Sequence, residues 1–291
     1  MKPFLIKLSK GLLITSIFYL ITFFIVYDNY YKKYLDNLND VNTNKILLSD
    51  SHGLALNNLE TKLNVKNLSF GSDSFLDMYR KLDFVNSLNK IDTVYISLDE
   101  HLFSSYRDNF NNSHISSFIV KNKSLIELIK DFNVLPGSKG HLFLQNKIKL
   151  GLYNLIKPPS ILSKKDQNWG EANSNSKNIK AERRVALQFK DFSILQHNYF
   201  DSIYKYCNKF KIKLIGIKFP LSKDYLNFRN SNLKFKQYNI NYHNIQLIDF
   251  SKAFINNDSL FRDQDHVNEK GANLILSILN NNSIEALADE K

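Results

Sequence analysis

Residues 45–53 read Lys-Ile-Leu-Leu-Ser-Asp-Ser-His-Gly, an apolar run of strand length that leads into a polar, turn-forming tetrapeptide. Such a run predicts a buried strand, and the turn places Ser51 at its carboxyl end. In α/β sheets the carboxyl ends of the strands present ligands and catalytic groups. Ser51 is therefore a candidate nucleophile, although polar strand ends without a chemical role are common.

Strands and helices alternate along most of the chain. Four further strands are predicted, at residues 65–71, 92–98, 213–219 and 245–250. Segments with helical spacing of apolar residues lie between or after them, at residues 54–63, 72–85, 189–210 and 268–279. This order predicts an α/β fold with a parallel sheet covered on both faces.

The alternation is interrupted between residues 102 and 186. This segment contains the breakers Pro136-Gly137 and Pro158-Pro159 and a polar stretch over residues 164–180. Roughly eighty residues are too many for a plain loop. We therefore predict an insertion that forms a lid or a face that contacts substrate or a partner.

The first 44 residues precede the predicted sheet. Residues 11–27 carry no charge, and with their flanks they are just long enough to cross a bilayer as a helix. A cleaved signal peptide would need a small-x-small site, which residues 26–30 lack. Three lysines precede the span and two follow it, which favours a cytoplasmic N-terminus. We predict a cytoplasmic segment at 1–10, a single-pass anchor at 11–27, a stalk at 28–44 and an extracytoplasmic domain at 45–291.

The formal net charge of the chain is +11, but its lysines are scattered and no run of five basic residues occurs. Nucleic-acid binding is therefore disfavoured, whereas a basic solvated surface fits, as does attraction to anionic lipid or an acidic polymer. Cys207 is the single cysteine, so an intrachain disulfide and a cysteine metal site are excluded. The histidines show no metal-ligand spacing, and we predict neither a metal nor a cofactor.

A base for Ser51 occurs near the other end of the chain, in Asp263-Gln264-Asp265-His266. A serine hydroxyl needs a base within hydrogen-bond reach, which a third group must orient. Asp263 can fold back and accept the imidazole N–H of His266, whereas Asp265 competes for this role and is expected to face solvent. The loop follows the last strand, so Ser51 and His266 are predicted to meet at one edge of the sheet.

Acyl transfer also needs donors for the oxyanion that develops on the carbonyl oxygen. The backbone N–H groups of Ser51 and Gly71 are the candidates, because both residues follow predicted strands. Glycine allows close approach of the backbone to a ligand, although an ordinary turn explains Gly71 equally well.

Three further polar residues are candidates for auxiliary roles. His52 follows the predicted nucleophile, where it could polarise a carbonyl group or make a structural hydrogen bond. The side chain of Asp50 is expected to stabilise the turn. His101 comes soon after the third strand, and either His101 or an asparagine of the predicted insertion is a candidate side-chain oxyanion donor.

These motifs resemble those of the SGNH (GDSL-like) hydrolases. Ser49-Asp50-Ser51-His52 is similar to their first block, with Ser49 in the glycine position, and Gly71 is similar to their oxyanion glycine. Asp263 and His266 match their Asp-x-x-His block, whereas their Gly-x-Asn-Asp block has no counterpart at residues 97–101. The resemblance covers residues 45–101 and 189–280. It implies a three-layer α/β sandwich with a flavodoxin-like parallel sheet, here preceded by a transmembrane helix.

An N-terminal anchor, an Asp-Ser-His block and the missing third block are similar to one branch of that family. Its members work with MBOAT-type membrane acyltransferases in acylating cell-wall or extracellular polymers. The resemblance implies a serine O-acyltransferase of polysaccharides, with Ser51 as the acylated residue and a multispanning membrane acyltransferase as partner. A polysaccharide O-acetylesterase and a non-catalytic partner of the membrane enzyme remain alternatives, since a fold does not determine a function.

Overall fold

The computed structural model describes residues 2–26, 32–120 and 169–281 of the chain. The chain divides into two compact units. Helices α1 and α2 belong to the first unit, and the second unit, residues 40–122 and 164–291, contains the sheet.

Five parallel strands form the sheet of the second unit. They are β1 (Lys45–Leu48), β2 (Lys66–Asn67), β3 (Thr93–Ser97), β4 (Lys213–Lys218) and β5 (Gln246–Asp249). Their spatial order, β2-β1-β3-β4-β5, is that of flavodoxin-like doubly wound sheets. The predicted parallel α/β fold is therefore confirmed. In this order the chain changes direction between β1 and β3, and ligands bind beyond the carboxyl ends of the strands at such a point.

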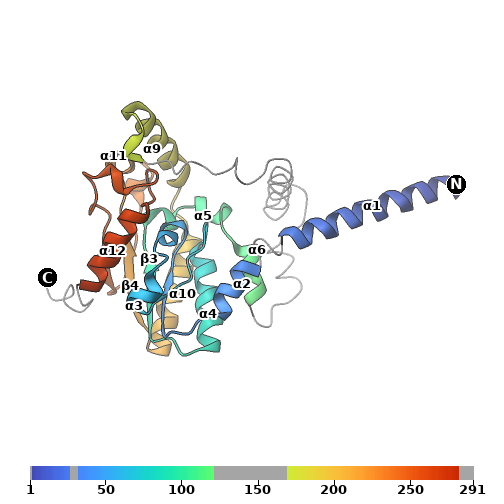
Figure 1. The fold of residues 1–291 in the computed structure, drawn as a ribbon, viewed down its shortest axis with the longest axis horizontal. Coiled ribbons are helices and arrows are strands. Elements are labelled where there is room, and N and C mark those ends of the chain that lie inside the picture. The colour runs from blue at the N-terminus through green and yellow to red at the C-terminus, as the bar shows by residue number, and fades with distance from the viewer. Residues whose placement is uncertain (1, 27–31, 121–168, 282–291) are drawn as a thin grey trace. The chain divides into compact units, whose positions relative to one another are not determined.

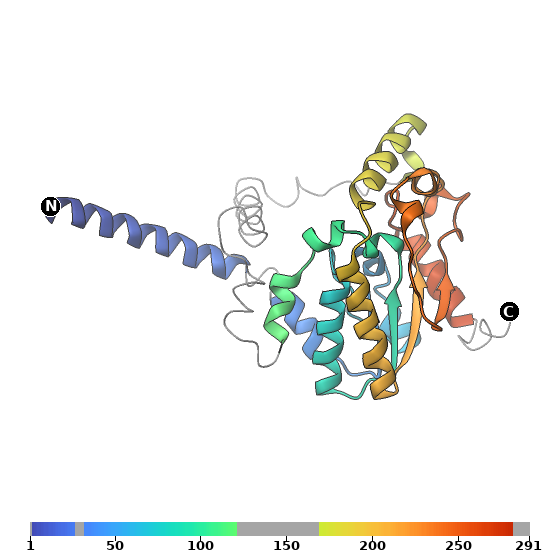
Figure 2. The same ribbon diagram turned by 180° about the vertical axis from the view of Figure 1, so that it is seen from behind.

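Helices cover both faces of the sheet (Figure 1, and Figure 2 from behind). On one face α4 (Phe75–Leu88) packs against α10 (Ile194–Phe210). On the other lie α3 (Leu59–Leu63) and α12 (Glu269–Asn281). The pair α9 (Ser174–Gln188) and α11 (Lys223–Ser231) shares one hydrophobic core with α12.

Local sequence signals explain where these helices begin. The side chain of Ser74 accepts the backbone N–H of Asp77, and the Asp77 carboxylate accepts the backbone N–H of Ser74. This reciprocal capping box starts α4 after Ser74, within the segment 72–85 that is predicted to be helical. On α10 the thiol of Cys207 is buried, and burial raises its pKa to about 12, as befits a core residue.

The predicted anchor and the predicted stalk as far as Asn39 belong to the first unit. Helix α1 (Lys2–Val26) occupies most of the predicted anchor, and α2 (Lys32–Asn39) lies within the predicted stalk. Among the described residues, no helix combines the length and the apolar character needed to span a membrane. The transmembrane helix expected from the sequence is thus not found there.

The predicted insertion at 102–186 is only partly described, since residues 121–168 lie outside the described residues. Its first part consists of short helices, namely η3 (Glu100–Phe103), α5 (Tyr106–Asn109), α6 (Ser113–Ser116) and η4 (Ser117–Ile119). Its last part contributes to the hydrophobic core. There η6 (Trp169–Glu171) and α9 bury Trp169, Ala181 and Val185 in the core on the α12 face.

Candidate functional site

The turn after β1 holds Ser51 in a short 3₁₀ helix, η2 (Ser51–Ala55). The carboxylate of Asp50 caps this helix by accepting the backbone N–H of His52 at 3.1 Å, which confirms the predicted turn-stabilising role of Asp50. The hydroxyl of Ser49 accepts the backbone N–H of Gly53 at 3.1 Å. The Ser49 side chain therefore has a structural function in this turn.

A neighbouring amide fixes the other end of η2. Asn67, at the end of β2, donates from its Nδ2 to the carbonyl oxygens of Gly53 and Leu56, at 2.8 and 3.2 Å. The turn that carries Ser51 is therefore held from both sides, which limits the positions that the Ser51 hydroxyl can take.

Gly53 is expected to be intolerant of a side chain. A Cβ atom built there would lie 2.2 Å from Ser69 Oγ and 2.7 Å from Ser49 Cβ, and the Ser49 Cβ is fixed to the backbone. Gly53→Ala should therefore lower the free energy of unfolding by about 1–3 kcal/mol, measured by urea denaturation. Gly71→Ala is the matched control, because its Cβ would meet no atom within 4 Å. Equal stability of the two variants would contradict this close packing around Gly53.

Ser51, His266 and Asp263 form a continuous hydrogen-bonded chain. Ser51 Oγ lies 2.9 Å from His266 Nε2, and His266 Nδ1 lies 2.7 Å from Asp263 Oδ1. Asp263 Oδ1 also accepts the backbone N–H of His266 at 3.0 Å, which holds the loop closed on itself. The predicted meeting of Ser51 and His266, 215 positions apart, is confirmed as a matter of geometry. The arrangement is that of a serine, a base and an orienting carboxylate.

Asp265 does not face solvent, and that expectation was wrong. Its carboxylate is fully buried, with Oδ1 at 3.2 Å from His266 Nδ1. Its Oδ2 accepts hydrogen bonds from Arg184 Nε at 2.9 Å and Gln188 Nε2 at 3.0 Å, both on α9. The reason for the error is that α9, which supplies these donors, lies in the predicted insertion. His266 thus sits between two carboxylates, one half-exposed and one buried.

These carboxylates determine how readily His266 takes a proton. Burial lowers the pKa of His266, but the charge of Asp265 and the hydrogen bond to Asp263 outweigh it, so the net shift is upward. The pKa of Asp265 is held well below its usual range, because His266 and Arg184 outweigh the effect of burial. His266 is therefore a stronger base than a free imidazole, as a group that accepts a serine proton requires.

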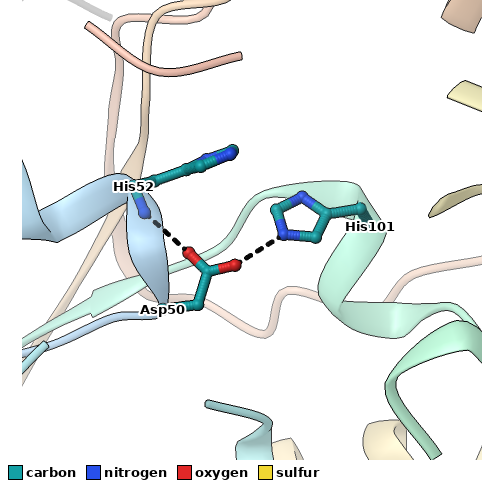
Figure 3. A group of neighbouring side chains, drawn as sticks. All are labelled: Asp50, His52 and His101. Atoms are coloured by element: carbon teal, nitrogen blue, oxygen red, sulfur yellow. Dashed lines mark hydrogen bonds and ion pairs between the residues drawn. The ribbon is translucent and has the colours of Figure 1, made fainter. Parts of the chain in front are cut away.

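A second set of buried ionisable groups lies directly behind the triad. Asp50 Oδ2 lies 2.8 Å from His101 Nε2 and also accepts a hydrogen bond from Arg107 Nη2. Figure 3 shows Asp50 together with His52 and His101. His52 Nδ1 lies 2.8 Å from Asp99 Oδ2, and the ring centroids of His52 and His266 are 5.0 Å apart. All of these side chains are buried.

The auxiliary roles expected of His52 and His101 change accordingly. The ring nitrogens of His52 face Asp99 and Asp265, the latter at 3.7 Å, so its contacts are structural and not directed at a substrate carbonyl. His101 Nε2 faces Asp50 and Arg107, the latter at 3.0 Å, so this nitrogen is not free to serve as an oxyanion donor.

Two groups of three potential metal ligands occur in the described residues, and neither suits a cation. In the first, Asp50, His52 and His101, the guanidinium of Arg107 already contacts the ligand atoms of Asp50 and His101. The second group, His52, Asp265 and His266, is engaged with Asp99, Arg184, Asp263 and Ser51. A metal would have to displace charged partners, so the donor sets favour an ion-pair network. The predicted absence of a metal stays a prediction.

The two predicted oxyanion donors lie near each other in the fold. The backbone N–H of Phe70 donates to the carbonyl oxygen of Ser49 at 3.1 Å, which carries the chain past β1 and places Gly71 next along it. Asn112 Nδ2 fixes the Gly71 loop by donating to the Gly71 carbonyl oxygen at 2.8 Å. Within the described residues, no hydrogen bond uses the N–H of Ser51 or Gly71. Both groups stay candidate oxyanion donors.

Ser51 and His266 open into a cleft of about 610 Å³ that polar and apolar side chains line in similar measure. The wall formed by η2 and the following turn contributes Leu54, Asn57 and Asn58, and the loop before α12 with its first turns contributes Arg262, Asn268, Glu269, Lys270 and Asn273. The triad therefore lies at the surface of the protein, where a large substrate can reach it.

Comparison with protein-family models and with curated proteins finds no match to this chain. The resemblance to the SGNH hydrolases stays a prediction that rests on the motifs alone.

Sequence reasoning missed four residues of the site. Asp99 could have been found, because it follows β3 at the same sheet edge as Ser51. Arg107 and Arg184 could not, since they lie on helices within the segment that shows no clear alternation, and Gln188 follows directly after that segment at the end of α9.

Proposed function

We propose that this protein is a serine-dependent O-acyltransferase that carries an acyl group on Ser51 and transfers it to a hydroxyl group of a polysaccharide. One observation carries the proposal, namely the hydrogen-bonded chain from Ser51 Oγ through His266 to Asp263 at the mouth of an open cleft. A serine at such a distance from an oriented imidazole can be deprotonated as it attacks a carbonyl carbon.

The first half of the proposed reaction acylates the enzyme. Ser51 Oγ forms a bond to the carbonyl carbon of the acyl donor while its proton passes to His266 Nε2. The electron pair of the C=O bond moves onto the oxygen, where the backbone N–H groups of Ser51 and Gly71 are the proposed donors that stabilise it. The intermediate collapses, the bond to the leaving group breaks, and His266 returns the proton to that group.

The second half reverses these roles with an acceptor hydroxyl in place of the donor. His266 accepts the hydroxyl proton as the acceptor oxygen attacks the acyl carbon. The bond to Ser51 Oγ then breaks, and His266 gives the proton back to Ser51. Asp263 orients the imidazole and stabilises its positive charge in both halves.

The lining of the cleft supports a carbohydrate acceptor. Asn57, Asn58, Asn268 and Asn273 offer amide donors and acceptors, which match the hydroxyl groups of a sugar. Apolar side chains, among them Leu54 and Leu276, line the cleft to a similar extent. An open cleft also admits water, so an O-acetylesterase that uses the same residues is the second candidate.

A cell-envelope location and an MBOAT-type membrane partner belong to the same proposal. The partner rests on the resemblance alone, and the location also rests on the uncharged segment 11–27 with its flanking lysines. An alkaline carbonate wash of membranes tests the location, because an integral anchor keeps the chain in the membrane fraction. Recovery of the chain in the washed supernatant would contradict the anchor.

Acylation of Ser51 is expected to be directly observable. Incubation of the full chain with a fluorophosphonate, which forms a stable adduct with activated serines, should label Ser51, as read by peptide mass spectrometry. His266→Ala should lose the label, because the base that activates the hydroxyl is removed. Labelling of Ser51 that is unchanged in His266→Ala, or no labelling of either chain, would contradict the proposal.

An assay with the same full chain distinguishes acyl transfer from hydrolysis. With an aryl acetate as donor, addition of an oligosaccharide should divert the acetyl group from water to the sugar, measured as acetylated sugar per aryl alcohol released. Release of acetate alone at every sugar concentration would favour the esterase.

A further inference from the structure

We propose that His52 is a buried imidazolium that joins Asp99 to Asp265 and thereby sets the basicity and position of His266. It would be a positioning residue, since it does not touch the reacting atoms. The inference rests on the proposed function, because it concerns the base of that reaction.

The charge of His52 follows first from the position of Asp99. This carboxylate is 2% exposed and receives three hydrogen bonds or polar contacts: from Ser97 Oγ at 2.9 Å, the Phe219 N–H at 2.9 Å and His52 Nδ1 at 2.8 Å. A buried carboxylate needs a cationic partner, since burial of an unpaired charge is strongly unfavourable. Among the described residues, His52 is the sole ion-pair partner of Asp99.

The neighbouring carboxylates already have cations of their own. Asp50 is paired with Arg107, and Asp265 is paired with Arg184. A neutral His52 would therefore leave three buried carboxylates with two guanidinium groups. A protonated His52 balances the set, which assigns it the charge.

The second ring nitrogen supports the same assignment. His52 Nε2 points at Asp265 Oδ2 across 3.7 Å, so both nitrogens face carboxylates and neither faces a hydrogen-bond donor that would need an acceptor. Burial lowers the pKa of His52, but the carboxylates of Asp50 and Asp99 outweigh it and raise the pKa well above its ordinary value.

Two imidazole rings face His52 in addition to the three carboxylates. The ring centroid of His101 lies 4.8 Å from that of His52, and the ring centroid of His266 lies 5.0 Å from it. The pKa of His101 is lowered, chiefly by burial, so His101 adds no charge near neutrality. The remaining ring neighbour, Phe219, is apolar.

A fixed positive charge 5.0 Å from the His266 ring opposes protonation of that ring, whereas Asp265 favours it. The pKa of His266 therefore depends on the opposing charges of His52 and Asp265. Loss of the His52 charge alone should raise the pKa of His266, and loss of the Asp265 charge alone should lower it.

The test is the pH profile of kcat/KM for ester cleavage by the full chain. His266 must be neutral to accept the Ser51 proton, so a higher pKa moves the acidic limb to higher pH. His52→Asn keeps a donor for Asp99 and removes the charge, and its acidic limb should move upward by about one pH unit. Asp265→Asn should move the limb downward, and the double variant should lie between the two.

His101→Asn is the matched control, since it removes a buried imidazole of the same network without a change of charge. The acidic limb of its pH profile should lie at the same pH as in the wild type, even if its kcat/KM differs. An unmoved limb in His52→Asn, or the same shift in His101→Asn, would overturn the proposal and leave His52 a packing residue.

A measurement on the wild-type chain decides the matter if a variant does not fold. The nitrogen-15 chemical shifts of selectively labelled histidine distinguish an imidazolium from a neutral ring. His52 should show two protonated nitrogens at about pH 8, where a free imidazole is neutral. A neutral His52 signal would overturn the inference. Failure of the proposed function is seen separately, as unchanged ester cleavage in a variant without the Ser51 hydroxyl.

Discussion

Ser51→Ala should abolish turnover of acetyl esters, with a fall in kcat/KM of about 10⁴-fold or more. The variant lacks the atom that forms the acyl-enzyme, while the imidazole of His266 keeps its contact with Asp263 at 2.7 Å. The measurement is release of the aryl alcohol from an aryl acetate by the purified full chain. The loss should be as large for His266→Ala, because the two residues act as one unit and their effects are not additive.

Ser231→Ala is the matched control for this prediction. Ser231 is an exposed serine at the end of α11, and its hydroxyl donates to the nearby Phe228 carbonyl oxygen. Its variant should cleave the ester at the wild-type rate. Wild-type cleavage by Ser51→Ala would show that the chemistry lies elsewhere, and it would favour a non-catalytic partner of another enzyme.

The central part of this site was predictable because parallel strands end at a common edge. Ser51 follows β1, and His266 lies in the loop between β5 and α12, so strand order alone brought them together. No detailed knowledge of packing was needed. The local contact of Asp263 with His266, three residues apart, follows equally from chain geometry.

The burial of Asp265 could not be predicted from the sequence. Its neighbours in sequence give no sign of burial, and its carboxylate is buried because Arg184 and Gln188 reach it from α9. The sequence of α9 is mostly polar, and its buried face consists of little more than Ala181, Val185 and Gln188. Such a narrow apolar stripe does not stand out from a solvated helix. The environment of the second carboxylate therefore depends on tertiary contacts that no local pattern indicates.

Arg107→Met should destabilise the protein by about 3–5 kcal/mol near neutral pH, because it leaves the Asp50 carboxylate in the interior without its guanidinium partner. Both side chains are buried, Arg107 at 4% and Asp50 at 0% exposure. Methionine fills a similar apolar volume, so lost packing contributes less than lost charge. Urea denaturation of the full chain measures the effect.

Arg183→Met is the control for this prediction. Arg183 is an exposed residue of α9, and its replacement should change the free energy of unfolding by no more than about 0.5 kcal/mol. An effect of Arg107→Met as small as that of the control would contradict a structural role for the pair.

The loss in free energy of unfolding caused by Arg107→Met should also depend on pH. In the wild type, the charges of His52, Arg107 and His101 outweigh burial and hold the pKa of Asp50 well below its usual range. A depressed carboxyl pKa contributes stability above the unfolded pKa and loses it as the pH falls through the folded pKa. Without Arg107 the depression is smaller, so the difference between variant and wild type should narrow below about pH 4.

Because of His101, the difference in the free energy of unfolding between wild type and Arg107→Met should begin to decrease at a higher pH than Asp50 alone would cause. Burial is the main cause of its lowered pKa, and the charge of Arg107 lowers it further. Removal of Arg107 allows His101 to take a proton beside Asp50, and a raised histidine pKa stabilises the fold below the unfolded pKa. The deficit should therefore be larger at about pH 7.5 than at about pH 5.

Asp50→Asn/Arg107→Met removes both charges and should recover much of the stability that Arg107→Met alone loses. Asparagine can still cap η2 by accepting the backbone N–H of His52, so the double variant keeps the turn that holds Ser51. Recovery would show that the cost of the single variant is an unpaired buried carboxylate. No recovery would mean that Arg107 acts through its packing on Tyr106, whose ring lies 5.4 Å from its guanidinium carbon.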